Sequence, residues 1–403
     1  MLSLFQTLAR PVFRGRFAGV GGRLTMPRPE DAPRAHAPGI EPDRILVFGN
    51  GAAVGWGVRS HDLALPGHLA RQVSGLTGRG VDVDLVADPI ITVATAARLI
   101  PEPRLATYDA IVIVIGMSDA LRMTSVRTWR RHLADLLDRF TAARDDGAGV
   151  FVVGLLPPSS LKIFSLKEGN AADASAARLN AVSQELCDER EGVHFVKTPE
   201  RSHEPVADRM HVAPDIFKSM AVTLAVDLAP LLDTRFAAGR QACPLRVRAQ
   251  SDEERLAAIR RLCILDSRPE KRFDEIVERA RILLGTSGAA FSLVDQDRVW
   301  NKAVAGTAVV ESPLRGAMCA ETIKGNGSLI VPDVWSDDRF VTHPSVRFYA
   351  GYPVETPDGI RVGALCVTDP APRPVDSVDL VLLRELALAV QRELAQRAAP
   401  VGV

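Results

Sequence analysis

Hydrophobic and polar positions follow two alternating periods over the first half of the chain. Short, nearly continuous apolar runs predict strands, and segments with a 3.6-residue period lie between them. The clearest helical segment, 126–140, is apolar at i, i+3 and i+4 spacings and carries Arg and Asp on its other side. Apolar strands that alternate with helices are typical of a parallel sheet covered on both faces, which predicts an α/β domain over 44–234. The predicted strands are 44–48, 81–86, 109–115, 150–155 and 193–196.

The pattern changes in the second half. Ser251 and Glu254 form a capping box at the start of a predicted helix, and a second helical pattern covers 270–284. Several strand-like runs then follow one another without long helices between them, and Thr356–Gly359 has the composition of a hairpin turn. This order predicts an α+β domain with an antiparallel sheet over 251–398. Its predicted strands are 289–295, 298–304, 328–331, 347–354 and 361–368.

Length and composition agree with two domains. A chain of 403 residues, 47% of them hydrophobic, is too long for one ordinary core. The polar, basic stretch at 235–250 is predicted to link the two domains. Residues 1–43 contain several arginines before the first acid at Glu30, and are predicted to form a basic, disordered tail. A membrane-touching basic arm, or a translation start at Met26, is an alternative for this tail.

Charge and cysteine content narrow the class of protein. The 49 basic residues balance the 49 acidic ones, so we expect neither nucleic acid nor an anionic membrane as a partner. No run is apolar enough to predict a secretion signal or a membrane span. The five cysteines are widely spaced, which favours reduced thiols acting as small core residues in the cytoplasm over disulfides or a metal site.

Three polar or glycine-rich segments follow predicted strands of the first domain. They are Gly49–Gly51, Gly116–Asp119 and Asp208–His211. Ligands of parallel sheets bind at the carboxyl ends of the strands, so these segments are expected to meet at one edge. The glycines after the first strand also resemble a phosphate-binding turn, but the acidic residues of the next strand lie too far along the chain for a dinucleotide site. A tight turn explains these glycines better.

These segments resemble the four sequence blocks of the SGNH hydrolase family, which has a flavodoxin-like, three-layer α/β/α fold. The resemblance covers 44–232 and places Gly51 where the family has its nucleophilic serine, and Ser118 where it has an oxyanion-hole asparagine. The family's glycine block falls near Pro89, which has no N–H to donate. Only Asp208 and His211 keep the family pattern. Loss of one oxyanion donor costs about 2.7–4 kcal/mol in the transition state, so we expect this domain to be catalytically silent.

Other interpretations of these residues stay open. If the domain is active, the resemblance makes His211 the base and Asp208 its orienting partner, with Ser60, Ser159 or Ser160 as a displaced hydroxyl. The alternative is that Asp208 and His211 form a hydrogen-bonded structural pair without chemistry. Asp119 is expected to close the turn after its strand.

The second domain closely resembles a GAF domain, the small-ligand sensing module of bacterial signalling proteins. The resemblance rests on ordered strings such as Ser292–Asp295, Met318–Ala320, Arg347–Gly351 and Gly363–Val367. The loop between Pro344 and the following strand is shorter than is usual in the family. A shortened loop removes part of the wall around a ligand pocket.

The resemblance implies that this domain binds a small ligand of unknown identity. No His-rich or Cys-rich spacing predicts a cofactor or a metal. Aromatic and thiol side chains are the candidates for its pocket, although core packing is the simpler role for each of them. Cys319 and Cys366 lie on elements that converge in the family's fold, so they also predict a possible regulatory disulfide. The candidate ligand-binding residues are Trp300, Cys319, Phe348, Tyr349 and Cys366.

The last predicted helix carries two apolar stripes. Leu380, Leu383, Ala387, Val390 and Leu394 form the first stripe, and Leu382, Leu386 and Ala389 form the second. The resemblance implies that the flanking helices of a GAF domain pair two subunits, so we expect a homodimer. The signal is expected to pass to another signalling protein.

The sequence therefore predicts a cytoplasmic regulatory protein in which a silent SGNH-like domain is coupled to a ligand-binding or dimerising GAF domain. One alternative is an active esterase with a displaced nucleophile, regulated by the GAF domain. A second alternative is a thiol-based redox sensor.

Overall fold

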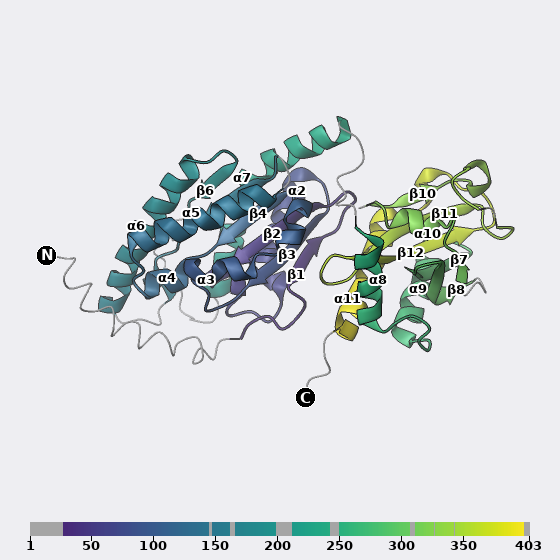
Figure 1. Cartoon of the computed structure of the whole chain (residues 1–403), viewed down its shortest axis with the longest axis horizontal. Helices are drawn as coiled ribbons and strands as arrows, with labels where there is room; N and C mark the ends of the chain where they lie inside the picture. Colours follow the sequence, from purple (N-terminus) through teal and green to yellow (C-terminus); the bar gives the residue numbers. More distant parts are fainter. Residues whose placement is uncertain are drawn as a thin grey trace. The chain divides into compact units, whose positions relative to one another are not determined.

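A computed structural model describes residues 27–144, 147–161, 166–198, 212–241, 250–306, 311–325, 327–341 and 343–398. The chain divides into two compact units, 1–243 and 244–403, and each is described by itself. Among the described residues, no helix is long and apolar enough to cross a membrane. Figure 1 shows both units and labels most of their helices and strands.

The first unit contains a six-stranded sheet in the order β1-β3-β2-β4-β5-β6. All neighbouring strands are parallel except β1, which runs antiparallel to β3. The five predicted strands are confirmed, because buried parallel strands give the continuous apolar runs seen in the sequence. The strands are β1 (Arg34–Ala37), β2 (Asp43–Gly49), β3 (Val81–Ala87), β4 (Ala110–Val114), β5 (Gly149–Val153) and β6 (Val193–Val196).

Helices cover both faces of this sheet, as the alternation of strands and helices predicted. Ile45 and Val47 of β2 face a core shared with α2 and α7, whereas Leu46 and Phe48 face a core shared with α5 and α6. Successive strand residues point to opposite faces, so one strand contributes to both cores. In Figure 1, α5 and α6 run along the same face. The helices are α2 (Leu65–Thr77), α3 (Val93–Ala96), α4 (Met117–Leu121), α5 (Val126–Ala143), α6 (Leu166–Asp188) and α7 (Val212–Gln241).

Short 3₁₀ helices complete the connections of the first unit. They are η2 (Gly51–Val54), η3 (His61–Leu63), η4 (Ala97–Leu99), η5 (Glu102–Thr107) and η6 (Pro158–Leu161). The first of these, η2, begins directly after β2 and therefore forms the turn at the predicted site.

Part of the predicted N-terminal tail belongs to the folded domain. Residues 34–37 form β1, which pairs with β3, and Ala35 and Ala37 are buried. A four-residue strand with only two apolar positions gives too short an alternation to be recognised in the sequence. Similarly, α7 continues into the predicted linker and ends at Gln241.

The second unit contains an antiparallel six-stranded sheet in the order β10-β11-β12-β7-β8-β9. The predicted capping box is present, with Ser251 and Glu254 each accepting a hydrogen bond from the other's backbone N–H. The predicted strands are confirmed, and the short edge strand β9 is an addition. The strands are β7 (Gly288–Val294), β8 (Arg298–Ala305), β9 (Glu311–Pro313), β10 (Leu329–Val331), β11 (Phe348–Glu355) and β12 (Arg361–Asp369).

The two faces of this sheet differ in what covers them. Three longer helices, α8 (Asp252–Leu262), α9 (Lys271–Leu283) and α11 (Leu380–Ala398), pack over one face and close the larger apolar core. The short helix α10 (Met318–Thr322) and the segment around η7 (Val334–Ser336) cover the other face. A further turn of 3₁₀ helix, η8 (Val375–Ser377), precedes α11.

Both apolar stripes of α11 contribute to the core of its own unit. Leu383, Ala387, Val390 and Leu394 of the first stripe are buried there, as is Leu386 of the second. Leu380, Leu382 and Ala389 are partly buried and pack against the same core. The stripes are therefore explained by packing within the unit, and a homodimer through this helix remains a prediction.

Candidate functional site

The turn after β2 lies at the carboxyl edge of the parallel sheet, where the sequence places the hydrolase nucleophile. A Cβ atom on Gly49 would lie 1.9 Å from the carbonyl oxygen of Val114 on the neighbouring strand, so only glycine fits there. Gly51 follows with a φ of +61°, in the left-handed region that favours glycine. The chain at the end of β2 thus turns sharply, and Gly51 presents no heteroatom.

Asn50, immediately before Gly51, is 1% exposed and holds this edge together. Its side-chain amide donates to the carbonyl oxygen of Ile91 at 2.7 Å and to the Ser118 hydroxyl at 3.2 Å. Ser118 in turn donates to the carbonyl oxygen of Pro89 at 3.4 Å. The segments that follow β2, β3 and β4 are therefore joined by neutral hydrogen bonds. Both N–H bonds of the Asn50 amide are used within the protein.

Asp119 lies within α4, and the hydrogen bonds of its carboxylate reach α3 and the residues after α4 rather than the turn after β4. It is 1% exposed and accepts hydrogen bonds from the backbone N–H of Val93 at 2.9 Å and from the Thr124 hydroxyl at 3.0 Å. Burial raises the pKa of Asp119 to about 6, although both donors favour the charged form. These contacts make Asp119 a link between α3 and α4.

Of the predicted hydrolase positions, Gly51 follows Asn50 in the chain, and Ser118 accepts a hydrogen bond from the Asn50 amide. Asp208 and His211 lie outside the described residues. The hydroxyl groups of Ser60 and Ser159 each donate to an aspartate rather than to a histidine. The structure therefore brings together two of the predicted positions.

A histidine that the sequence reasoning missed lies beside one of these serines. His61 is buried, and its Nδ1 atom lies 2.6 Å from a carboxylate oxygen of Asp31. Ser60 donates to the other oxygen of the same carboxylate at 2.9 Å, instead of to the imidazole. Asp31 belongs to the segment predicted as a tail, so no sequence pattern connected it to His61. The arrangement orients a histidine but lacks the hydroxyl-to-base hydrogen bond of a nucleophilic pair.

The five candidate ligand-binding residues of the second unit lie on two faces of the sheet. Trp300 and Phe348 belong to the larger core under α8, α9 and α11. Cys319, Tyr349 and Cys366 belong to the smaller core under α10. Phe348 and Tyr349 are neighbours on one strand, so their side chains must point to opposite faces. The five candidates are therefore divided between two cores, and ligand binding by either group remains a prediction.

The smaller core brings two thiols into contact. The Sγ atoms of Cys319 and Cys366 lie 3.8 Å apart, and both residues are buried. The Tyr349 hydroxyl donates to Cys319 Sγ at 3.5 Å and lies 2.7 Å from the Thr322 hydroxyl. Cys366 Sγ lies 3.6 Å from the carbonyl oxygen of Ala290 and donates to it. Two potential nucleophiles therefore share one polar cluster within an apolar core.

The environment separates the acidities of the two thiols. The hydrogen-bond contact with Cys366, together with those of Ser292 and Tyr349, outweighs burial and lowers the pKa of Cys319 to about 7. The same contact and burial raise the pKa of Cys366 well above its usual range. Burial also raises the pKa of Tyr349, which keeps its phenol protonated and able to donate. Cys263, by contrast, is exposed, so the prediction that all cysteines fill the core is wrong for this one.

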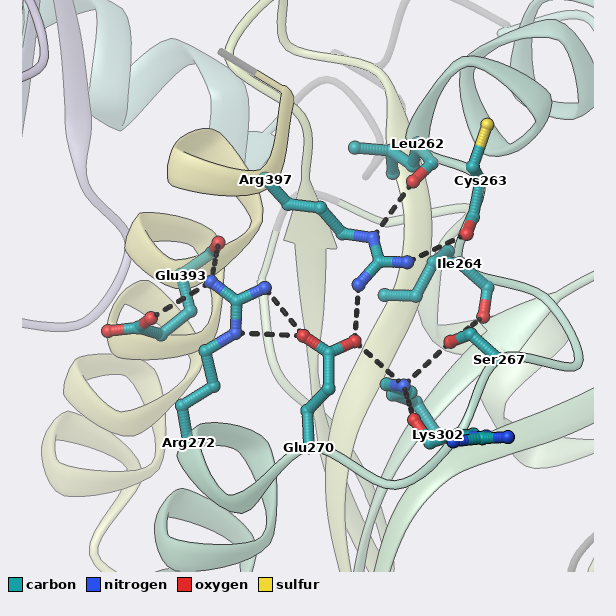
Figure 2. A network of polar contacts seen from close by, with 10 residues as sticks. Leu262, Cys263, Ile264, Ser267, Glu270, Arg272, Lys302, Glu393 and Arg397 are labelled. Atoms are coloured by element: carbon teal, nitrogen blue, oxygen red, sulfur yellow. Dashed lines mark hydrogen bonds and ion pairs between the residues drawn. The ribbon is translucent and has the colours of Figure 1, made fainter. Parts of the chain in front are cut away.

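A charged network that sequence reasoning also missed surrounds Glu270, the residue before α9. Figure 2 shows three cationic side chains, Arg272, Lys302 and Arg397, converging on the Glu270 carboxylate. The side chain of Lys302 is 0% exposed, and its ammonium lies 2.9 Å from Glu270. Burial by itself would raise the pKa of Glu270, but the hydrogen bonds and charges of the three cations lower it to about 2.

This network connects elements that are far apart in the sequence. Arg397, near the end of α11, also donates to the carbonyl oxygens of Leu262 and Cys263 at the end of α8. Lys302 also donates to the Ser267 hydroxyl at 2.7 Å. The network therefore fixes α11 to the α8–α9 connection. Its members have no common motif or spacing, so no pattern in the sequence identified it.

Within the described ranges, no group of three or more His, Cys, Asp or Glu side chains could hold a metal ion.

Residues 47–217 match the family model "GDSL-like Lipase/Acylhydrolase family", and residues 268–394 match the "GAF domain" model. The chain thus combines a GDSL-like lipase/acylhydrolase domain with a C-terminal GAF domain, as the resemblances implied. The parallel first sheet and the antiparallel second sheet agree with these two classes.

One similar curated protein is a cyclic di-GMP phosphodiesterase of Pseudomonas aeruginosa, 33% identical over 152 residues. The match covers 36% of this chain and 26% of that protein, so the chain spans about a quarter of its relative's length.

Two solved structures are similar to parts of the chain. A free methionine-R-sulfoxide reductase from Neisseria meningitidis is 20% identical with a TM-score of 0.28, over 37% of this chain and 92% of that one. Est24, a carbohydrate acetylesterase from Sinorhizobium meliloti, is 16% identical with a TM-score of 0.36, over 47% and 99%.

Proposed function

We propose that this chain is a regulatory protein whose GDSL-like domain does not hydrolyse esters, and whose GAF domain binds a small ligand or pairs two copies. The observation that carries the first half is the turn after β2. Gly51 offers no attacking atom there. The neighbouring Asn50 amide donates to the Ser118 hydroxyl, which itself donates to the carbonyl oxygen of Pro89.

The first domain lacks the family's groups at both the nucleophile position and the oxyanion hole. Acyl transfer by this route needs a hydroxyl or thiol that a base can deprotonate, and a glycine has neither. Pro89 has no N–H, and the Ser118 hydroxyl already donates to the Pro89 carbonyl oxygen. Each missing oxyanion donor costs about 2.7–4 kcal/mol of transition-state stabilisation. A displaced hydroxyl that attacked an ester would therefore form a transition state without these donors.

The sensory half of the proposal rests on the GAF match and on the named signalling relative. The cytoplasmic location expected from the wide spacing of the five cysteines is part of the same proposal. We further propose a separate signalling protein as the receiver of the signal.

Hydrolysis is tested with p-nitrophenyl acetate and p-nitrophenyl butyrate. The full chain is expected to show no turnover above a heat-killed control, and His211→Ala is expected to change nothing. Turnover that His211→Ala abolishes would overturn the silent-domain proposal and support the displaced nucleophile.

Ligand binding and pairing are tested separately from hydrolysis. A ligand at 100 times its dissociation constant stabilises the native protein by about 2.7 kcal/mol, which thermal-shift screening of nucleotides, fatty acids and aromatic compounds can detect. Sedimentation equilibrium measures whether two copies associate. A monomer that none of these compounds stabilises would contradict the sensory half of the proposal.

Thiol-based sensing is a second candidate function, favoured by the 3.8 Å contact between Cys319 and Cys366. Two free cysteines this close need only a small displacement to form a disulfide. Peroxide should therefore produce a faster-migrating band on non-reducing gels. Cys319→Ser and Cys366→Ser should each abolish that band.

A further inference from the structure

The hydrogen bonds around the two thiols of the GAF domain give them different roles. Cys319 Sγ accepts from the Tyr349 hydroxyl at 3.5 Å, and donors next to sulfur favour the thiolate. Cys366 Sγ donates to the Ala290 carbonyl oxygen at 3.6 Å, and an acceptor next to sulfur favours the protonated thiol. The geometry therefore separates a nucleophilic sulfur from a protonated one.

A chain of hydroxyl groups supports this assignment. The Thr322 hydroxyl lies 2.9 Å from the carbonyl oxygen of Met318, to which it donates, and 2.7 Å from the Tyr349 hydroxyl. Each hydroxyl has only one proton. When Cys319 ionises, Tyr349 can turn its proton to the thiolate while Thr322 turns its own proton to Tyr349. The two hydroxyl groups can therefore stabilise the charge without any movement of the backbone.

Resting on the second candidate function, we propose that Cys319 is a modification site for a small hydroperoxide and that Cys366 resolves the oxidised sulfur into a disulfide. The Cys319 thiolate attacks one peroxide oxygen, the O–O bond breaks, and the departing hydroxide or alkoxide takes a proton. Cys319 becomes a sulfenic acid, oxidised by two electrons, and the peroxide is reduced.

The second step uses the neighbouring thiol. Cys366 loses its proton and its sulfur attacks the sulfenic sulfur, the S–O bond breaks, and hydroxide leaves as water. For hydrogen peroxide, two thiols and one peroxide give one disulfide and two waters. Tyr349 acts here as a positioning residue, because it donates to the attacking sulfur and does not react.

Disulfide formation would act on α10 more than on the sheet. The two sulfur atoms must approach from 3.8 Å to about 2.05 Å. Cys366 lies on β12, which is paired on both sides by β11 and β7, whereas Cys319 lies on the five-residue helix α10. The helix is the less constrained element and is expected to move toward the strand. Oxidation would thereby change how α10 packs over the smaller core.

Burial sets which oxidants can react. Cys319 is 7% exposed and Cys366 is 5% exposed, so a compact oxidant reaches the sulfur more readily than a bulky one. Hydrogen peroxide is therefore expected to oxidise the pair faster than cumene hydroperoxide. Equal rates with both oxidants would contradict attack inside the closed core.

The experiment uses the full chain, reduced and then exposed to hydrogen peroxide, with peptide mass mapping of the products. A cross-link between the peptides of Cys319 and Cys366 is expected, and Cys263→Ser, which removes an exposed thiol, should leave it unchanged. In Cys366→Ser, dimedone should trap a sulfenic acid on Cys319. In Cys319→Ser, dimedone should label no core thiol.

Tyr349→Phe tests the positioning role. Loss of the donor should raise the pKa of Cys319; a rise of one unit from 7 would slow oxidation at pH 7 about fivefold and shift the pH profile upward. An unchanged profile would remove this role from Tyr349.

The outcomes distinguish thiol-based sensing itself from the assignment of Cys319 as the attacking thiol and Cys366 as the resolving thiol. No cross-link in the folded wild-type chain would overturn thiol-based sensing itself, and with it this assignment. A cross-link together with dimedone labelling of Cys366 in Cys319→Ser would keep the sensing function and overturn the assigned order. Cys319→Ala and Cys366→Ala serve as second variants if a serine hydroxyl prevents folding of the core.

Discussion

The turn after β2 and the thiol pair under α10 differ in which atoms they contain. The turn occupies the position where parallel sheets bind ligands, and it has polar side chains, yet its central residue is Gly51. The thiol pair lies in an apolar core, at positions whose simplest role is packing, and it holds two sulfur atoms in contact. Position in a fold therefore indicates where chemistry can occur, while the atoms present decide whether it does.

We expect the charged network around Glu270, rather than the thiol pair, to stabilise the GAF unit. Glu270→Ala tests this stabilising role, because it leaves the fully buried Lys302 ammonium without its carboxylate. Breaking one side of a buried pair costs about 3–5 kcal/mol, so the free energy of unfolding should fall by about 3 kcal/mol. Denaturant unfolding measures the change. Glu275→Ala, an exposed carboxylate on the same helix, should change it by about 0.5 kcal/mol or less.

The pH dependence of stability gives a second test of the same residue. Because the folded-state pKa of Glu270 is depressed from 4.5 to about 2, its contribution is present above about pH 4.5 and is lost as the pH falls toward 2. Glu270→Gln should flatten this part of the profile. If Glu270→Gln shows the same dependence of unfolding free energy on pH as the wild type, the network does not stabilise the unit through the Glu270 charge.

Asn50→Ala tests whether the turn after β2 is structural. It removes the amide that joins Ile91 and Ser118, and should destabilise the first unit by about 1–3 kcal/mol. Denaturant unfolding is again the measurement. Asn50→Ala with unchanged stability would mean that this amide is free for another purpose, such as holding a ligand.

Gly51→Ser restores a hydroxyl to the predicted nucleophile position. The φ of +61° should cost about 1–2 kcal/mol for any residue with a Cβ atom, and that atom would lie 3.3 Å from Cβ of Met117. We expect lower stability and no gain of ester hydrolysis, and Gly51→Ala should lose the same stability. Turnover in Gly51→Ser but not in Gly51→Ala would show that the serine was the only missing group.

The smallest expected effect is the pH dependence of thiol oxidation. Since the pKa of Cys319 is about 7, the rate with hydrogen peroxide should rise as the pH increases through 7 and then level off. Mass spectrometry of samples quenched over time measures this rate. A rate that continues to rise to pH 9 would indicate an unperturbed thiol.

The sequence predicted the two sheets well because buried strands are continuous apolar runs. It missed β1 and β9, which are edge strands of four and three residues with little apolar alternation. The opposite directions of Phe348 and Tyr349 could have been predicted from strand alternation. The 3.8 Å contact of Cys319 with Cys366 could not, because it depends on how α10 packs on β12.

The hydrogen-bond and ion-pair partners of the buried polar residues were the features least predictable from the sequence. Asn50 could have been singled out as a buried amide beside Gly51, but its partners Ile91 and Ser118 come from two other loops. The network around Glu270 joins charges from three separate segments, and its composition resembles that of any charged surface. Only the fold brings such groups together.

Fluorophosphonate labelling of the full chain, read by intact mass and peptide mapping, tests the central claim most directly. An active serine esterase treated in parallel provides the positive control. We predict no adduct on this chain, because the turn after β2 presents no nucleophilic oxygen. A single adduct on a hydroxyl within residues 44–234 would contradict the claim.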